Sequence, residues 1–166
     1  MTVTAVHKDA ESLTMSISAE FDVGKERVWQ LWSDPRQLER WWGPPTYPAT
    51  MTVHELQPGG EVRYHMTGPE GDQHHGHWRI IAVNEPDSLS FLDTFADQEG
   101  NPNEEMPQTD VSVLIEDLGD GRTRMSISSV FESVEAMEQM LAMGMEEGMT
   151  LAMGQIDAIL AGQPVR

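Results

Sequence analysis

The sequence contains no cysteine, few basic residues and no long apolar run. Without cysteine the chain has no disulfide, no thiol nucleophile and no thiolate metal ligand. Only 10 Lys and Arg accompany 28 Asp and Glu, and the formal net charge of −18 opposes binding to nucleic-acid phosphates or anionic lipid surfaces. No stretch approaches membrane-spanning length, and the N-terminal region lacks a basic segment followed by an apolar one. We therefore expect a cytoplasmic protein that has neither nucleic acid nor membrane as a partner.

The segment between Lys25 and Pro45 reads KERVWQLWSDPRQLERWWGPP and holds four of the five tryptophans. Apolar residues recur there at helical spacing and predict two short consecutive helices. Asp34 can cap the second helix, and Pro35 is tolerated in a first turn. Because helices this short are unstable alone in water, we expect the pair to pack on a larger structure, with its tryptophans as a structural aromatic plug.

Alternating apolar and polar residues predict seven strands. The clearest runs from Leu13 to Phe21, where every second side chain is apolar. Short turns rich in Gly, Pro and Asp separate the strands, which indicates an antiparallel sheet. The strand from His75 to Val83 is apolar on both faces, so its register stays open. Asp97 to Gln108 is the only long connection in this pattern.

The chain ends in a predicted helix from about Val134 to Ala161, with Ser133 as its N-cap. Its apolar arc is too broad for a helix that rests on a flat core, and a sheet that curls around the helix would explain this width. Six of the twelve methionines lie between Met137 and Met153, with Gly144 and Gly148 among them. This composition fits either an adaptable ligand pocket or a methionine-rich core in which a strand approaches the glycines.

The order of these elements resembles the START-like, or SRPBCC, helix-grip superfamily. The pieces ERVWQLWSDPRQLERWWGPP, LQPGGEVRYHM, GHWRIIAVNEPDSLSF and GMEEGMTLAMGQIDAIL resemble the branch named after the activator of the heat-shock-protein-90 ATPase. The expected fold is α+β: a seven-stranded curved antiparallel sheet that grips a long C-terminal helix, with two short helices between strands 1 and 2. The expected domain covers residues 13–161, after a flexible arm (1–12) and before a short tail (162–166).

The resemblance implies an apolar cavity between the sheet and the last helix, but no single reaction. Members include lipid carriers, hormone receptors, polyketide cyclases and co-chaperone domains, and fold does not fix function. The co-chaperone that named the family carries a separate N-terminal domain, for which this sequence shows only a short polar arm. Co-chaperone activity is therefore a weak inference from the resemblance.

Polar side chains on the inner face of the expected cavity are the best candidates for ligand contact. Asp93 is in phase with Leu89 and Phe91, and if buried it could act as an acid or base; the favoured alternative is that it lies at a strand end and faces water. Gln155 either reaches the cavity or bonds to backbone. The candidate ligand-binding residues are Tyr64, Met66, Trp78, Phe91, Asp93, Met137, Leu141, Met145 and Gln155.

Four histidines, at positions 65, 74, 75 and 77, form the only metal-like cluster in the sequence. Two histidines spaced by two on a strand, with a third across a hairpin, can bind zinc. However, Tyr64 and Met66 occupy the inner face of their strand, which places His65 outside, and no carboxylate completes a ligand set by spacing. We expect exposed imidazoles, no metal and no cofactor.

The function that these patterns favour is binding of a small hydrophobic molecule by a monomer or homodimer. No nucleophile–base pair or phosphate loop indicates catalysis, so we assign no catalytic residue. Two alternatives remain: a cyclase-, dehydratase- or hydrolase-like enzyme that uses a pocket Asp or His, and a protein-interaction module that regulates a chaperone.

Overall fold

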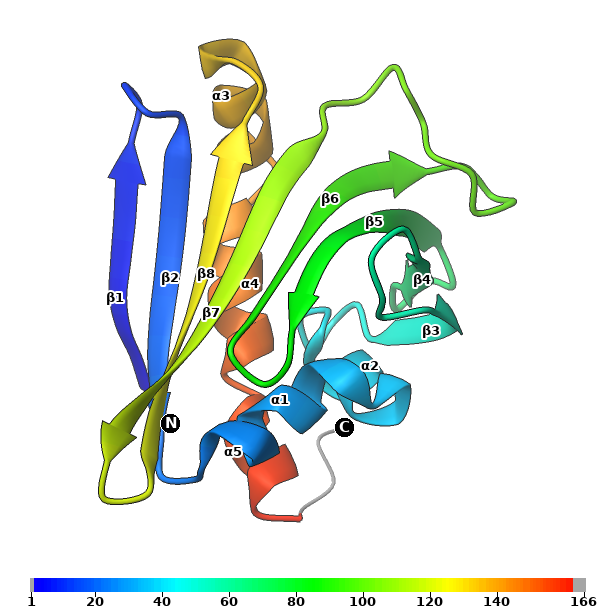
Figure 1. Cartoon of the computed structure of the whole chain (residues 1–166). Helices are drawn as coiled ribbons and strands as arrows, with labels where there is room; N and C mark the ends of the chain where they lie inside the picture. The colour runs from blue at the N-terminus through cyan, green and yellow to red at the C-terminus, as the bar shows by residue number, and fades with distance from the viewer. Residues whose placement is uncertain (1, 163–166) are drawn as a thin grey trace.

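The computed structural model describes residues 2–162, and the side chains of residues 5–162. Eight antiparallel strands form one curved sheet in the order β1-β2-β8-β7-β6-β5-β4-β3 (Figure 1). The strands are β1 (Thr2–Asp9), β2 (Thr14–Phe21), β3 (Ala49–His54), β4 (Glu61–Thr67), β5 (Gln73–Asn84), β6 (Ser88–Ala96), β7 (Thr109–Gly119) and β8 (Arg122–Phe131). The helices are α1 (Lys25–Ser33), α2 (Pro35–Trp41), α3 (Val134–Ala142), α4 (Met145–Met153) and α5 (Ile156–Leu160).

The predicted fold class is confirmed, with one correction to the strand count. The α+β helix-grip arrangement is present: the sheet curves around the C-terminal helical segment, and α1 and α2 connect β2 to β3. The sheet has eight strands rather than seven, because Thr2–Asp9 pairs with β2 as an edge strand. Its end at His7, Lys8 and Asp9 is exposed and polar, which hid it in the sequence pattern. Residues 163–166 of the predicted tail lie outside the described residues.

The two short helices form the expected aromatic plug. Asp34 caps α2 by accepting a hydrogen bond from the Arg36 backbone N–H at 2.9 Å, and Pro35 follows in the first turn. Trp32 and Trp41 are fully buried, with ring centroids 4.9 Å apart in an edge-to-face arrangement. The indole N–H of Trp41 donates to the carbonyl of Leu31 at 3.0 Å. This contact joins α2 to α1 and makes the pair one packing unit.

The C-terminal segment is helical, as predicted, but it is divided into α3, α4 and α5. Ser133 caps α3 through a 3.0 Å bond from the Ala136 N–H. Gly144 has φ +86°, a left-handed conformation that favours glycine and ends α3. A Cβ atom at Gly144 or Gly148 would meet nothing within 4 Å, so no strand approaches either glycine. The break separates the helical phase of α3 from that of α4.

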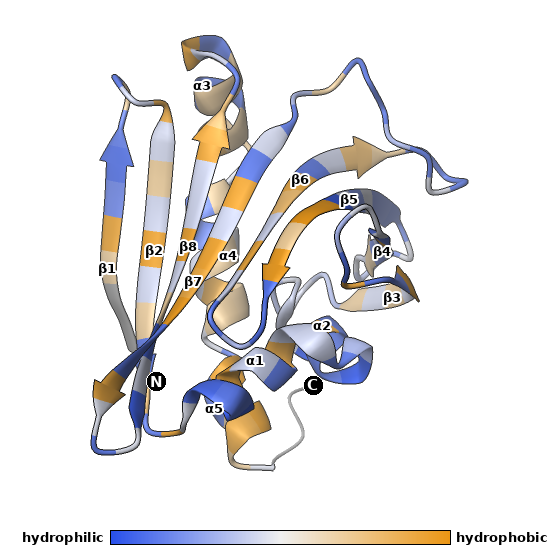
Figure 2. Ribbon diagram, viewed as in Figure 1, coloured by the Kyte–Doolittle hydropathy of each residue, from blue (hydrophilic) through white to orange (hydrophobic). Residues whose placement is uncertain are grey.

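The two faces of the sheet differ in chemistry. Apolar and polar residues alternate along β2, β7 and β8, which Figure 2 shows as alternating colours. The inner face packs on the helices, whereas the outer face carries serines. Ser16 bonds to Ser128 and Ser18 bonds to Ser126 across the β2–β8 pair, each with 3.0 Å between hydroxyl oxygens.

The register of β5 explains its ambiguous sequence. Trp78 and Ile80 face inward and are buried. A register shift between Ile80 and Ala82 then leaves Ile81 half-exposed on the outer face. A bulge of this kind breaks the strict alternation of a strand, so both faces read as apolar in the sequence.

Candidate functional site

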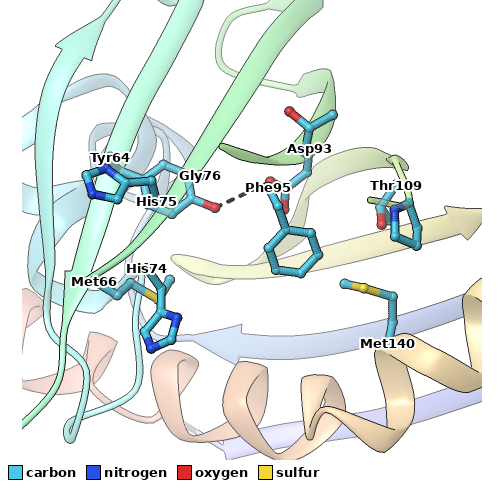
Figure 3. Close-up of a pocket in the computed structure, with 11 residues that line it drawn as sticks. Tyr64, Met66, His74, His75, Gly76, Asp93, Phe95, Thr109 and Met140 are labelled. Atoms are coloured by element: carbon cyan, nitrogen blue, oxygen red, sulfur yellow. Dashed lines mark hydrogen bonds between the residues drawn. The ribbon is translucent and has the colours of Figure 1, made fainter. Parts of the chain in front are cut away.

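A cavity of about 150 Å³ lies on the inner side of the sheet between β4–β7 and α3. Its wall is largely apolar and includes Met66 from β4, Phe95 from β6 and Met140 from α3 (Figure 3). Tyr64 and Asp93 add two polar groups that point toward each other. The cavity therefore combines an apolar wall with one hydrogen-bonding pair.

Asp93 is the acidic group of the cavity. In the strand register Asp93 lies opposite Trp78 of β5 and Thr109 of β7. Its side chain is therefore directed inward, on the same face of the sheet as that of Trp78. Its Oδ1 accepts a hydrogen bond from the Tyr64 hydroxyl at 3.3 Å. The favoured expectation, that Asp93 lies at a strand end and faces water, is wrong, because β6 keeps its alternation as far as Asp93.

Burial changes the acidity of both groups. It raises the pKa of Asp93 from 3.8 to about 7, because the carboxylate loses hydration, and the bond from Tyr64 opposes this shift. It also raises the pKa of Tyr64 well above its usual value, and the charge of Asp93 adds to that effect. Tyr64 therefore remains a hydroxyl donor at neutral pH, whereas Asp93 changes its protonation state near neutrality.

Two indole rings that do not line the cavity pack against Tyr64. Trp42 and Trp78 pack edge-on to its ring, with centroid distances of 6.3 Å and 6.0 Å. Among the described residues, both indole N–H groups are buried without a hydrogen-bond partner. They favour negative charge on the Tyr64 oxygen and so lower its pKa, although burial outweighs them. The tryptophans thus pack against the ring of Tyr64 and limit its movement.

The cavity brings together three of the nine predicted ligand-binding residues: Tyr64, Met66 and Asp93. Trp78 and Phe91 lie in the adjacent core, stacked with 4.0 Å between ring centroids and fully buried. Met137 is also a core residue, and Met145 packs against the core from its edge.

Leu141 and Gln155 lie elsewhere. Leu141 borders a shallow depression between α3 and α4 that also includes Thr150. Gln155 is buried, and its Nε2 donates to the Gly43 carbonyl at 2.7 Å. This is the backbone-bonding alternative, and it ties the end of α4 to the end of α2.

Eight lining residues were not among the predicted ones: His74, His75, Gly76, Thr94, Phe95, Pro107, Thr109 and Met140. Phe95 continues the alternation of Asp93, so the sequence contained a signal for it. Met140 follows Met137 by three residues and shares its face of α3. A single continuous helix phased through Leu141 and Met145 concealed this relation. Thr109 is identified only by the β6–β7 register.

Of the four clustered histidines, His74 and His75 line the cavity, whereas His65 and His77 do not. The rings of His65 and His75 are 5.5 Å apart, and partial burial lowers the pKa of His65. His77 was expected to be exposed, but it is buried, with Nε2 2.9 Å from Glu61 Oε2. This bond lowers the pKa of Glu61, which also pairs with Arg63 at 3.1 Å.

Within residues 2–162, no three His, Asp or Glu side chains lie together so that they could hold a metal ion.

A curved antiparallel sheet that wraps a helical segment and leaves a small cavity defines a helix-grip protein. Residues 22–161 match the family model described as Activator of Hsp90 ATPase homolog 1-like protein, and the chain belongs to this family. None of the helices in the described part of the chain is long and apolar enough to cross a membrane.

Solved structures agree with this assignment. A protein from Arthrobacter aurescens is 53% identical, with a TM-score of 0.92 over 97% of this chain and 93% of its own. The protein Ms6760 from Mycobacterium smegmatis is 48% identical, with a TM-score of 0.87 over 95% of this chain and 96% of its own. A protein from Rhodobacter sphaeroides, at 23% identity and a TM-score of 0.80 over 95% of this chain and 98% of its own, shows the same fold. No curated protein matches the sequence.

Proposed function

We propose that this protein binds a small, largely apolar molecule in the cavity between the sheet and α3. The observation that carries the proposal is the Tyr64–Asp93 pair on an otherwise apolar wall. Small-molecule sites typically combine an apolar lining with a few convergent polar groups that orient the ligand. The family and fold support a pocket protein of this kind.

The volume of the cavity limits the size of its ligand. An apolar protein cavity of roughly 150 Å³ accepts a molecule such as benzene, and the cavity here has about this volume. The molecule that fits without rearrangement is therefore a single ring or a short branched chain. A larger ligand would extend through the open side of the cavity or displace Met140, which forms part of the wall.

Two methionines of the same segment provide a matched test. Met140 lines the cavity, whereas Met143 is 56% exposed. We expect Met140→Trp to fill the cavity and abolish binding of toluene, while Met143→Trp binds it as the parent does. Ligand-observed NMR measures binding, and thermal unfolding checks that both variants fold. The proposal fails if neither toluene nor phenol binds the parent, or if a folded Met140→Trp variant binds toluene as tightly as the parent does.

An acid–base enzyme is the second candidate, and the observation that favours it is a cavity carboxyl with a pKa of about 7. A group that changes protonation near neutral pH is suited to proton transfer. In deuterated water, such an enzyme would accelerate exchange of the α-protons of a small ketone such as cyclopentanone. Proton NMR follows the exchange, and Asp93→Asn should abolish any acceleration. Exchange equal to that of buffer would exclude this reaction for the ketone and leave binding as the function.

A further inference from the structure

We propose that the ligand of this cavity is a neutral hydroxyl compound, such as a phenol or a small cyclic alcohol, whose hydroxyl pairs with the second oxygen of Asp93. The inference rests on the proposed function and specifies the chemical class of its ligand. It follows from the geometry of one carboxyl group and from the charges around the cavity.

The two oxygens of Asp93 have different surroundings. Oδ1 accepts the hydrogen bond from Tyr64. No donor among the described residues lies within hydrogen-bond distance of Oδ2. This oxygen is also not among the buried polar atoms that lack a partner, so part of its surface is accessible. Asp93 is half-buried and lines the cavity, so its accessible oxygen opens into the cavity space. A ligand group placed there completes the hydrogen bonding of the carboxyl.

The charges around the cavity disfavour an anionic ligand. The titratable side chains that line it are Tyr64, Asp93, His74 and His75, with no Lys or Arg among the described lining residues. The imidazole of His74 is already paired with Asp72 at 3.0 Å. A carboxylate ligand would therefore meet Asp93 without a compensating guanidinium or ammonium, in a protein whose formal charge is −18.

A hydroxyl group matches both protonation states of Asp93. It donates to the carboxylate and accepts from the carboxylic acid, whereas a carbonyl can only accept. Since the pKa of Asp93 is about 7, the cavity presents both states near neutral pH. The hydroxyl keeps its hydrogen bond in each of them, while Met66, Phe95 and Met140 contact the apolar part of the ligand.

Toluene, phenol and benzoate test this assignment, because toluene and phenol have nearly the same shape and benzoate adds a charge. We expect the parent to bind phenol about five- to tenfold more tightly than toluene, the range of one hydrogen bond, and benzoate not measurably. Asp93→Leu should lose the preference for phenol and keep toluene binding. Asp110→Leu, at an exposed position of β7, serves as the control and should keep the preference.

The outcomes separate this inference from the proposed function. Failure of both toluene and phenol to bind the parent overturns the proposed function and this inference with it. Toluene binding without a preference for phenol, or a preference that survives in Asp93→Leu, overturns this inference alone, as does competition by benzoate. If Asp93→Leu does not fold, the side-chain carboxyl ¹³C signal of Asp93 in the parent decides: phenol should shift it and toluene should not. An equal response to both ligands overturns the assignment.

Discussion

Gly76 lies directly across the β4–β5 pair from Tyr64, and a Cβ atom at position 76 would be 2.2 Å from Cζ of the Tyr64 ring. The ring therefore occupies the space above the Gly76 backbone that any other side chain would fill. This contact keeps the Tyr64 hydroxyl within 3.3 Å of Asp93. The polar pair of the cavity thus depends on a glycine that contributes no polar group.

Replacing this glycine should displace the tyrosine. We expect Gly76→Ala to move the ring of Tyr64, to break its bond with Asp93 and to destabilise the fold by about 1–3 kcal/mol, the usual cost of overpacking. Denaturant unfolding measures the stability, and NMR shifts of the Tyr64 ring report its position. Gly24→Ala is the control, because a Cβ atom there would meet only one atom, at 3.7 Å. A variant with unchanged Tyr64 signals would show that the ring does not need this space.

The aromatic plug should be essential for stability. Trp32 and Trp41 are fully buried against each other, so we expect truncation of either to alanine to cost about 3–5 kcal/mol, as for other large core residues. Urea unfolding of each variant provides the measurement. Met143→Ala, at an exposed site of the C-terminal segment, should change the free energy of unfolding by less than about 0.5 kcal/mol. A cost below about 1 kcal/mol for either tryptophan would contradict a structural role.

Asp93 should make stability depend on pH. Because its pKa rises from 3.8 to about 7 on folding, the folded state binds the proton more tightly than the unfolded state does. Its stabilising effect is present at low pH and is lost as the pH rises through about 7. We expect the free energy of unfolding of the parent, relative to Asp93→Asn, to fall by up to about 1.4 kcal/mol per pH unit between pH 4 and 7.

Denaturant titrations of both proteins at several pH values test this dependence. Asp110→Asn is the matched control, because Asp110 is exposed on the neighbouring strand, and its stability should follow that of the parent. If the difference between the parent and Asp93→Asn is the same at every pH, Asp93 has its ordinary pKa in the folded protein.

Gly144 and Gly148 should respond to alanine in opposite directions. Neither position has an atom within 4 Å of a would-be Cβ, so only the backbone conformation distinguishes them. Gly144 has φ +86°, and Gly144→Ala should cost about 1–2 kcal/mol. Gly148 lies inside α4, and Gly148→Ala should stabilise by about 0.5–1 kcal/mol. Thermal unfolding compares the two, and stabilisation by Gly144→Ala would contradict a fixed helix break.

The elements that the sequence predicted well are those with local signals. Asp34–Pro35 identified the start of α2, and strict alternation identified β2. The bulge in β5 and the edge strand β1 escaped prediction, because one interrupts alternation and the other ends in exposed polar residues. In both cases the strand pairing has an irregular register, between Val3 and Ala5 in β1 and between Ile80 and Ala82 in β5.

The candidate site shows the same division. Asp93 and Tyr64 were identified because alternation alone directs them inward. The predicted helix residues Met137, Leu141 and Met145 do not line the cavity, and a left-handed Gly144 separates α3 from α4. Each residue of error in helical phase turns a side chain by about 100°, which is enough to exchange Met140 for Leu141 as the residue that faces the cavity. Local propensity does not determine whether a glycine continues a helix or breaks it.

The serine pairs of the outer sheet face have a consequence for how this acidic protein responds to salt. Ser16–Ser128 and Ser18–Ser126 cross the β2–β8 pair with neutral hydroxyl groups, whereas Arg122 and Glu20 provide an ion pair near one end of the same strands. Salt screens exposed ion pairs over a Debye length of about 8–10 Å, but a hydrogen bond between two hydroxyls carries no net charge to screen. The contribution of these serine pairs to the cohesion of β2 with β8 is therefore largely independent of ionic strength, and it adds nothing to the mutual repulsion of the surface carboxylates.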